Sequence, residues 1–402
     1  MDFTSRLVPK FGVVEVVVEA ILLSIAGIVL LLTFIAVRRW YRGRYFQQVS
    51  ERTFALRSRW NDILSGKVPA STWRLKALDC EIVESMLLDR LELAALPEEV
   101  PPLLNCLRST GLLDMRIYQA RAERGWKQRT ALIALGRTRA PEAVPALAAA
   151  LDSPEEETRI AAVRGLGHTE LAEAAIPVLE YLVWGSQSIP AHVVKNALIN
   201  CCYNSPGILL RYLKQASGRP RALLARVLGE VATAELGEDL ILLATDGDAE
   251  VRASAARALG NSRPAFALPV LSVMVTDPEW FVRLRAVVAL ASINHSARIR
   301  PLVRALCDCN RHVRLRAAWA LAQLGSNLDD IFNQVVETRD NYALQAFISE
   351  LERSGAIDGL INALEKEGER NQAHQVLLET LHATLQNLER DAKVLSASAG
   401  GR

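Results

Sequence analysis

Apolar residues recur along this chain at a helical spacing, and that pattern itself repeats about every 31 residues. The stretch DPEWFVRLRAVVALAS at residues 277–292 returns as DCNRHVRLRAAWALAQ at residues 308–323. Within each copy the apolar positions fall three or four apart, which is the spacing of one face of an α-helix. The equivalent residue near the end of each copy, called its closing residue, is Gly136, Gly167, Asn200, Gly229, Gly260, Ala291 or Ala322. A fixed period of this length indicates a stack of repeated structural units.

Each unit is predicted to contain two helices. Residues 267–274 are a short apolar segment with Pro269 in the first turn, where the missing N–H of proline costs no hydrogen bond. Residues 277–279 interrupt the pattern, and residues 282–291 form the second helix. Where a copy closes on glycine, we expect that glycine to end the second helix in the left-handed conformation. Neither helix can bury its apolar side alone, so the units must stack.

The sequence pattern of the repeat indicates which repeat family it resembles. The stretch AVPALAAALDSPEEETRIAAVRGLG at residues 143–167 resembles the short bacterial HEAT repeat, also called the phycobilisome-lyase-type HEAT repeat. Tetratricopeptide and ankyrin signatures are not present. The resemblance implies an all-α fold, an α-solenoid of about eight helix pairs over residues 125–364. It implies little about function, because members of this family mostly supply binding surfaces and only a small subset are lyases.

An aspartate in the turn precedes an arginine of the second helix by six or seven residues in four units. The aspartates are Asp152, Asp246, Asp277 and Asp308, and the arginines are Arg159, Arg252, Arg283 and Arg314. A carboxylate is favourable beside the free amides of a helix N-terminus, and a guanidinium can bridge the turns of adjacent units. We therefore predict a stabilising ladder here and no active site.

The resemblance also implies that the second helices line the concave side of the array. Positions three residues before each closing residue are Ile133, Arg164, Ala197, Arg226, Arg257, Val288 and Trp319; positions six before are Thr130, Ala161, Val194, Leu223, Ser254, Arg285 and Arg316. Arginine and tryptophan are enriched in interface hot spots. The predicted partner-binding residues are Arg164, Arg226, Arg257, Arg285, Arg316, Val288 and Trp319, facing an acidic or extended segment of a protein. The alternative is that these arginines are merely solvated.

One apolar stretch near the N-terminus is long enough to cross a membrane. Residues 20–37, AILLSIAGIVLLLTFIAV, carry no charge, and a bilayer core needs about 20 apolar residues. We predict a short extracytoplasmic segment at residues 1–12 and a transmembrane helix at residues 13–37. A cleavable signal peptide fits less well, because its apolar region is shorter and its basic residues come first. Glu15 and Glu19 are either hydrated at the outer interface or paired with a basic residue of another transmembrane helix.

Basic residues gather directly after this stretch. Arg6 and Lys10 precede it, whereas the arginines that follow are Arg38, Arg39, Arg42, Arg44, Arg52, Arg57 and Arg59. The positive-inside rule then predicts a single-pass protein of a bacterial inner (cytoplasmic) membrane, with its N-terminus outside and its repeats in the cytoplasm. Arg38, Arg39, Arg42 and Arg44, with Trp40 and Tyr41, are expected at the membrane surface against anionic lipid headgroups. Nucleic acid is not expected as a partner, because the headgroup phosphates are closer.

The rest of the chain is expected to cap the array. Residues 38–76 form a basic juxtamembrane segment, and residues 77–124 a helical cap that covers the open apolar side of the first repeat. Gly66 and Gly111 are expected to end helices in this region. Residues 365–402 are predicted to form a C-terminal helix followed by a disordered tail.

Candidate chemistry does not change this picture. The chain has no glycine-rich phosphate loop and no GxSxG, HExxH or CxxC motif. The stretch DGDAE at residues 246–250 resembles half of a calcium loop, but Val251 and Arg257 replace the required glycine and glutamate. The six cysteines are spaced for neither disulfides nor zinc and are expected to be small buried hydrophobes in a reducing compartment. No catalytic residue, metal or cofactor is therefore expected.

The leading hypothesis is a membrane-anchored cytoplasmic scaffold or adaptor that binds a protein partner, such as a membrane complex, and performs no catalysis. A special case is an accessory subunit of a membrane polysaccharide-synthesis or secretion complex. The alternative from another class is a phycobilin-lyase-like enzyme, or a binder of an anionic small molecule such as a bilin. A bound chromophore would give the purified protein a visible absorption band.

Overall fold

The computed structural model describes residues 13–74, 76–94, 96–185, 189–325, 328–361, 375–377 and 379. Regular structure in these residues is helical throughout, without a strand, which confirms the predicted all-α class. The chain divides into two compact units, Met1–Arg116 and Ile117–Arg402. This division falls inside the predicted cap at residues 77–124. The predicted C-terminal helix and tail lie outside the described residues, apart from positions 375–377 and 379.

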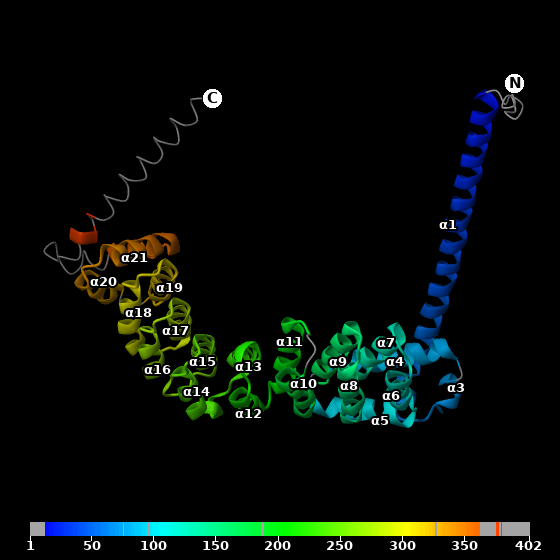
Figure 1. Cartoon of the computed structure of the whole chain (residues 1–402), viewed down its shortest axis with the longest axis horizontal. Helices are drawn as coiled ribbons and strands as arrows, with labels where there is room; N and C mark the ends of the chain where they lie inside the picture. The colour runs from blue at the N-terminus through cyan, green and yellow to red at the C-terminus, as the bar shows by residue number, and fades with distance from the viewer. Residues whose placement is uncertain are drawn as a thin grey trace, which may run out of the picture. The chain divides into compact units, whose positions relative to one another are not determined.

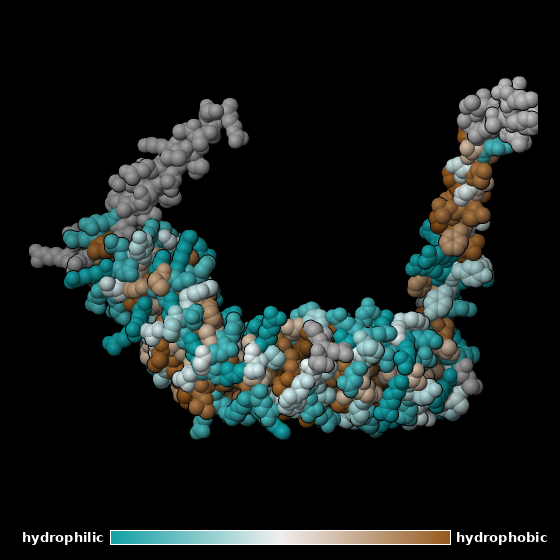
Figure 2. Space-filling model, viewed as in Figure 1, coloured by the Kyte–Doolittle hydropathy of each residue, from teal (hydrophilic) through white to brown (hydrophobic). Residues whose placement is uncertain are grey.

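The first unit begins with one long helix, α1 (Val13–Ser58; Figure 1). The side chains from Val18 to Gln48 are all exposed, and the helix is long and apolar enough to cross a membrane. Figure 2 shows the apolar part of α1 in brown and the basic part in teal. The helix continues beyond Val37 to Ser58, because residues 38–58 contain no proline and only one glycine, Gly43. The basic segment therefore begins as a continuation of the apolar helix.

The other elements of the first unit pack against α4 and α5. They are α2 (Trp60–Leu64), α3 (Ser71–Arg74), α4 (Ala77–Leu93), η1 (Pro97–Glu99), α5 (Val100–Ser109) and the start of α6 (Leu112–Ala122). Val83, Leu87 and Leu91 of α4 are fully buried, and α4 contacts α1 and α5. Gly66 and Gly111 follow α2 and α5 with φ of +72° and +68°, which confirms both as helix ends.

Two buried carboxylates tie the helices of this unit together. Arg52 of α1 donates to both carboxylate oxygens of Asp79 in α4, at 3.0 and 2.7 Å, and the Asp79 side chain is only 3% exposed. Arg116 of α6 holds Glu84 of α4 in the same way, through two hydrogen bonds of 2.6 Å. Because an unpaired buried carboxylate is costly, these pairs fix α1 and α6 to α4.

The second unit is a stack of helix pairs in chain order, as predicted. The first helices of the pairs are α8 (Val144–Ala149), α10 (Ala172–Trp184), α12 (Gly207–Gln215), α14 (Gly237–Ala244), α16 (Ala267–Met274), α18 (Ile299–Leu306) and α20 (Leu328–Glu337). The second helices are α7 (Trp126–Arg137), α9 (Glu156–His168), α11 (Ala191–Cys202), α13 (Gly218–Val231), α15 (Ala249–Ser262), α17 (Trp280–Ser292), α19 (Arg311–Ala322) and α21 (Asn341–Ser354). Short turns η2 (Pro141–Ala143), η3 (Ala150–Asp152), η4 (Ala234–Leu236) and η5 (Ser296–Arg298) flank the first helices. In Figure 1 the stack bends, and α13, α15, α17, α19 and α21 lie on its inner side.

The closing glycines correct one expectation from the sequence. Gly136, Gly167, Gly229 and Gly260 lie inside the second helices, and none of them has a positive φ. The left-handed residues between elements of the repeats include Arg139, Glu170, Arg263 and Arg339 instead. The glycines serve close packing: a Cβ on Gly260 would lie 2.7 Å from the Cβ of Ala289 in the next second helix. Consecutive second helices approach so closely that a side chain at this position has no room.

Candidate functional site

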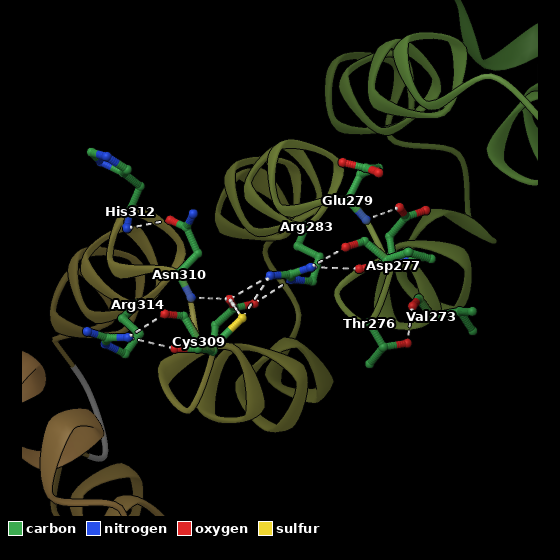
Figure 3. Close-up of polar contacts among 11 residues, drawn as sticks. Val273, Thr276, Asp277, Glu279, Arg283, Cys309, Asn310, His312 and Arg314 are labelled. Atoms are coloured by element: carbon green, nitrogen blue, oxygen red, sulfur yellow. Dashed lines mark hydrogen bonds and ion pairs between the residues drawn. The ribbon is translucent and has the colours of Figure 1, made fainter.

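Arginine side chains join the turns of adjacent repeats into the predicted ladder. Arg252 donates to both carboxylate oxygens of Asp277 in the next unit, at 2.7 and 2.9 Å, and to the carbonyl oxygen of Asp246 in its own turn, at 2.9 Å. Arg283 repeats this arrangement with Asp308 and with the backbone of Asp277 (Figure 3). The predicted bridge between adjacent turns is confirmed for Arg252 and Arg283, with the carboxylate supplied by the following unit.

The ladder is shorter than the sequence pattern indicated. Its rungs are Arg221–Asp246, Arg252–Asp277 and Arg283–Asp308, and the first of these begins at an arginine outside the four predicted pairs. Arg159 and Arg314 keep the contact with the backbone of their own turns. Beyond that contact, the guanidinium of Arg314 lies 5.5 Å from the ring centre of Tyr342. From here on, "the ladder" means the three rungs.

The ladder carboxylates are ionised structural groups. Each one also accepts a hydrogen bond from a backbone N–H two residues ahead, 2.9 Å long for Asp277 and 2.7 Å for Asp308. The hydrogen bonds from Arg221 lower the pKa of Asp246 more than burial raises it. Burial is the largest single influence on Asp277 and Asp308, but the arginine and amide hydrogen bonds together outweigh it and lower the pKa of both. These carboxylates are therefore unsuited to accept a proton near neutral pH.

The stretch that resembles half of a calcium loop belongs to this ladder. Asp246 binds Arg221, and Asp248 accepts a hydrogen bond of 2.8 Å from the backbone N–H of Glu250, where it caps α15. Both carboxylates thus have protein partners. No group of three or more potential metal ligands occurs among the described residues.

The seven predicted partner-binding residues lie on the second helices, and the five arginines among them differ in whether they form ion pairs. Arg164 and Arg285 are exposed and form no ion pair with any described residue. Arg226 is exposed and lies 3.7 Å from Glu250, a loose contact. Arg257 forms an ion pair with Glu230 at 2.6 Å, and Glu230 also forms an ion pair with Lys195 at 3.2 Å. Arg257 therefore already has an ion-pair partner inside the protein, although the single charge of Glu230 is shared with Lys195.

The C-terminal part of this face is aromatic as well as basic. The guanidinium of Arg316 stacks 4.1 Å from the ring centre of Trp319, a cation–π geometry. Val288 and Trp319 are half-buried. Nearby on the first turn of α17, Trp280 packs against His312 of α19, with their rings 6.0 Å apart. This aromatic pair was not singled out from the sequence, although the copies of the repeat place its members 32 residues apart.

A pocket opens between α11 and α13 that sequence reasoning missed. It has a volume of about 720 Å³ and is bounded by the end of α10, residues 189–191, α11 and the start of α13. Val194, Leu223 and Arg226, which the sequence placed on the concave face, line it. A sequence signal was present: Val194 stands four residues after the N-cap of α11, where α9, α13, α15, α17 and α19 carry arginine.

The predicted membrane-surface residues all lie exposed on α1. These residues are Arg38, Arg39, Trp40, Tyr41, Arg42 and Arg44. The guanidinium of Arg44 lies 4.3 Å from the ring centre of Trp40, and the Trp40 and Tyr41 rings are 5.1 Å apart. Arg52 differs from this group because it binds Asp79. Glu19 is exposed, whereas the side chain of Glu15 lies outside the described residues.

The cysteines only partly match the expectation that all six are buried hydrophobes. Cys106, Cys201 and Cys202 are buried, Cys80 is half-buried, and Cys307 and Cys309 are exposed. Burial raises the pKa of Cys201 and of Cys202 to about 12, so these thiols stay protonated. The turn between α18 and α19 buries the carboxylate of Asp308 but leaves the neighbouring Cys307 and Cys309 exposed.

Stacked helix pairs, an inter-repeat ladder and close-packed second helices define the class of the protein, an α-solenoid. A family model described as HEAT repeats matches residues 113–198, 206–291 and 267–395, more than half of the chain. The protein therefore belongs to the HEAT-repeat family, and the resemblance stated from the sequence is confirmed.

Similar solved structures include an engineered protein, 19% identical, with coverage of 77% of this chain and 96% of its own and a TM-score of 0.35. YibA of E. coli is 18% identical, the match covers 60% of this chain and 92% of YibA, and the TM-score is 0.34. A chain of the CpcE–CpcF complex of phycocyanin lyase from Nostoc sp. is 20% identical. The match covers 55% of this chain and 92% of that chain, with a TM-score of 0.24. No curated protein sequence matches this chain significantly.

Proposed function

We propose that the protein is a membrane-anchored scaffold whose repeat face binds an acidic segment of a partner protein, without catalysis. The observation that carries this proposal is the pair of exposed arginines, Arg164 and Arg285, which form no ion pair with any described residue. Between them lies Arg226 with its loose contact, and beyond them lies the stacked pair Arg316 and Trp319. Uncompensated cations beside a half-buried aromatic ring suit a partner that brings carboxylates and apolar groups.

Helix α1 supports the anchoring part of this proposal. An exposed apolar helix of this length is unstable in water and fits a bilayer, and an uncleaved anchor explains why it continues as one helix into the first unit. The basic and aromatic residues 38–44 would then meet anionic headgroups, with the repeats on the cytoplasmic side of a bacterial inner membrane. At 1.5 Å per residue, α1 holds its contact with α4 at Arg52 roughly 20 Å beyond the lipid boundary at Val37.

This spacing favours a partner that is itself part of a membrane complex. Two proteins confined to one membrane meet at a much higher effective concentration than two proteins free in solution. An accessory subunit of a polysaccharide-synthesis or secretion complex is one such case. The competing function, a lyase-like protein that holds a bilin, would be favoured by a visible absorption band in the purified protein.

The test replaces the two uncompensated arginines in one variant, Arg164→Glu with Arg285→Glu. Cross-linking in native membranes followed by affinity capture should recover at least tenfold less partner, because both contacts become repulsive. The melting temperature should change by less than about 2 °C, since exposed side chains without partners contribute little to stability.

The matched control is Arg300→Glu with Arg304→Glu on α18, which changes the net charge equally at two other exposed arginines. Capture by the control should equal that of the wild type. Undiminished capture by the Arg164/Arg285 variant would refute the proposed surface.

A further inference from the structure

We infer that the pocket between α11 and α13 receives a large apolar side chain of the partner, while Arg219 and Arg226 hold carboxylates next to that side chain. This inference rests on the proposed function and specifies the chemistry of the partner segment. It concerns a part of the repeat face where the regular packing between units is interrupted.

The pocket lies at a junction between units where the ladder has no rung. In α13, α15 and α17 an arginine four residues after the N-cap crosses to the aspartate of the next turn. In α11 this position is Val194, and the residue two before the N-cap of α13, where the aspartate would be, is Gln215. Neither a guanidinium nor its carboxylate partner fills the space between these two units. The space of about 720 Å³ that remains is within the range of specific binding pockets.

The walls of the pocket are largely apolar. Leu182 at the end of α10, Ile189, Val194 and Leu223 line it, together with prolines at 190 and 220. Val194 and Leu223 are 3% and 8% exposed, so the site is backed by the core of the solenoid. Burial of apolar surface here contributes roughly 25 cal/mol per Å², which favours an aliphatic or aromatic side chain over a polar one.

The free charge at the rim is positive. Arg219 is exposed and forms no ion pair with any described residue, and Arg226 is 55% exposed with only the 3.7 Å contact to Glu250. The carboxylate in the lining, Asp248, is engaged as the N-cap of α15. A partner segment with Asp or Glu beside its apolar side chain therefore matches both the walls and the rim.

The position of the occupant can be mapped by photo-cross-linking in native membranes with full-length protein. A benzophenone amino acid is placed at Ala191 on the pocket rim, at Leu315 next to Arg316, or at Leu242 on α14, all exposed positions. Adducts are expected at Ala191 and Leu315 and not at Leu242. Mass spectrometry of the Ala191 adduct should locate a segment with a large apolar residue within two positions of an Asp or Glu.

The outcomes separate the two proposals. Adducts at Leu315 without adducts at Ala191, or an Ala191 adduct on a segment without acidic residues, overturn the pocket assignment and leave the scaffold function standing. Absence of adducts at both Ala191 and Leu315 overturns both proposals.

A synthetic peptide copied from the mapped segment provides the quantitative test. Its affinity for the full chain in phosphatidylcholine nanodiscs, measured by fluorescence anisotropy, should fall at least tenfold for Arg219→Glu and for the pocket-filling variant Ala222→Trp. Arg300→Glu is the charge control and should bind normally. Ala191→Trp fills the pocket from an exposed position and replaces Ala222→Trp if that variant melts at a lower temperature than the wild type.

Compensating changes in the peptide decide whether the contacts are direct. Replacement of its acidic residue by lysine should restore binding to Arg219→Glu by at least fivefold, because the charges become complementary again. Replacement of its apolar residue by alanine should weaken binding to the wild type but cause no additional loss in Ala222→Trp, as expected for groups that share one site. Additive losses and no rescue would place the peptide elsewhere.

Discussion

At the scale of single residues, stability and binding are assigned to different arginines of the same helices. Arg221, Arg252 and Arg283 form the ladder, whereas Arg285, two residues after Arg283, and Arg164 on α9 form no ion pair with any described residue. The glycines that close the repeats are likewise structural, because each permits a close approach of the next second helix.

Removal of one ladder arginine should be strongly destabilising. In Arg283→Ala the carboxylate of Asp308, 6% exposed, loses its guanidinium and stays buried. We expect a loss of about 3 kcal/mol or more in the free energy of unfolding, measured by urea denaturation. The control Arg285→Ala removes the exposed arginine two residues away and should cost less than about 0.5 kcal/mol. Equal effects of the two substitutions would contradict the structural role of the ladder.

The ladder also predicts how stability depends on pH. The pKa of Asp246, Asp277 and Asp308 is lowered in the folded state, so the unfolded chain binds protons more readily than the folded one. Their stabilisation is complete above the ordinary value of 3.8 and is lost as the pH falls through the lower folded value. The stability difference between wild type and Asp308→Asn should therefore shrink below about pH 4, as followed by thermal melts between pH 7 and pH 3. A constant difference would show that ionisation of Asp308 contributes nothing.

Close packing of second helices is tested by Gly260→Val. The new side chain would overlap Ala289, whose Cα lies 2.8 Å from the added Cβ, and the expected destabilisation is about 1–3 kcal/mol. Gly247→Ala is the control, because nothing lies within 4 Å of its added Cβ. Differential scanning calorimetry should show a lower melting temperature for the first variant alone.

At the scale of elements, the long helix α1 has an exposed apolar part and a C-terminal part that packs against the rest of the first unit. Its apolar part is not buried by any described residue, while its C-terminal part packs on α4 through Arg52 and Asp79. One uninterrupted helix therefore connects the proposed anchor to the folded part of the first unit. In the proposed topology, a rigid connection of this kind would fix the height of that unit above the membrane.

The Arg52–Asp79 contact predicts how firmly the end of α1 is held. Arg52→Gln leaves the buried carboxylate of Asp79 without its ion pair, so α1 should detach from α4 more often. Hydrogen–deuterium exchange of residues 45–58 should accelerate at least threefold, because local opening becomes more frequent. Arg57→Gln, an exposed position on the same helix, should leave exchange unchanged.

At the scale of the whole molecule, the proposed topology assigns the repeats to the cytoplasm. Cys307 and Cys309 are exposed and can report on this without new cysteines. In intact cells a membrane-impermeant maleimide should not label them, and permeabilisation should make labelling possible. Cys307→Ser with Cys309→Ser is the control for label specificity, and Thr4→Cys should be labelled without permeabilisation. Labelling of Cys307 and Cys309 in intact cells would reverse the proposed orientation.

The chain by itself determined the elements of this protein, because helix formation and repeat stacking follow from local periodicity. The spacing of apolar residues was sufficient to predict the helix pairs. The recurring Asp and Arg predicted a ladder between turns, but only Arg252 and Arg283 of the four predicted arginines form rungs. The apolar run at residues 20–37 identified α1, although only the structure showed that the helix continues to Ser58.

Only the tertiary structure decided which charges are free and where the surface is hollow. Glu230 binds Arg257 from another helix, 27 residues away, and Asp79 binds Arg52 of the basic segment. The pocket lies where Val194 stands in place of a ladder arginine, and its shape depends on how α11 and α13 pack. Such contacts depend on the reach and angle between side chains of neighbouring helices, which the spacing of residues within one helix does not specify.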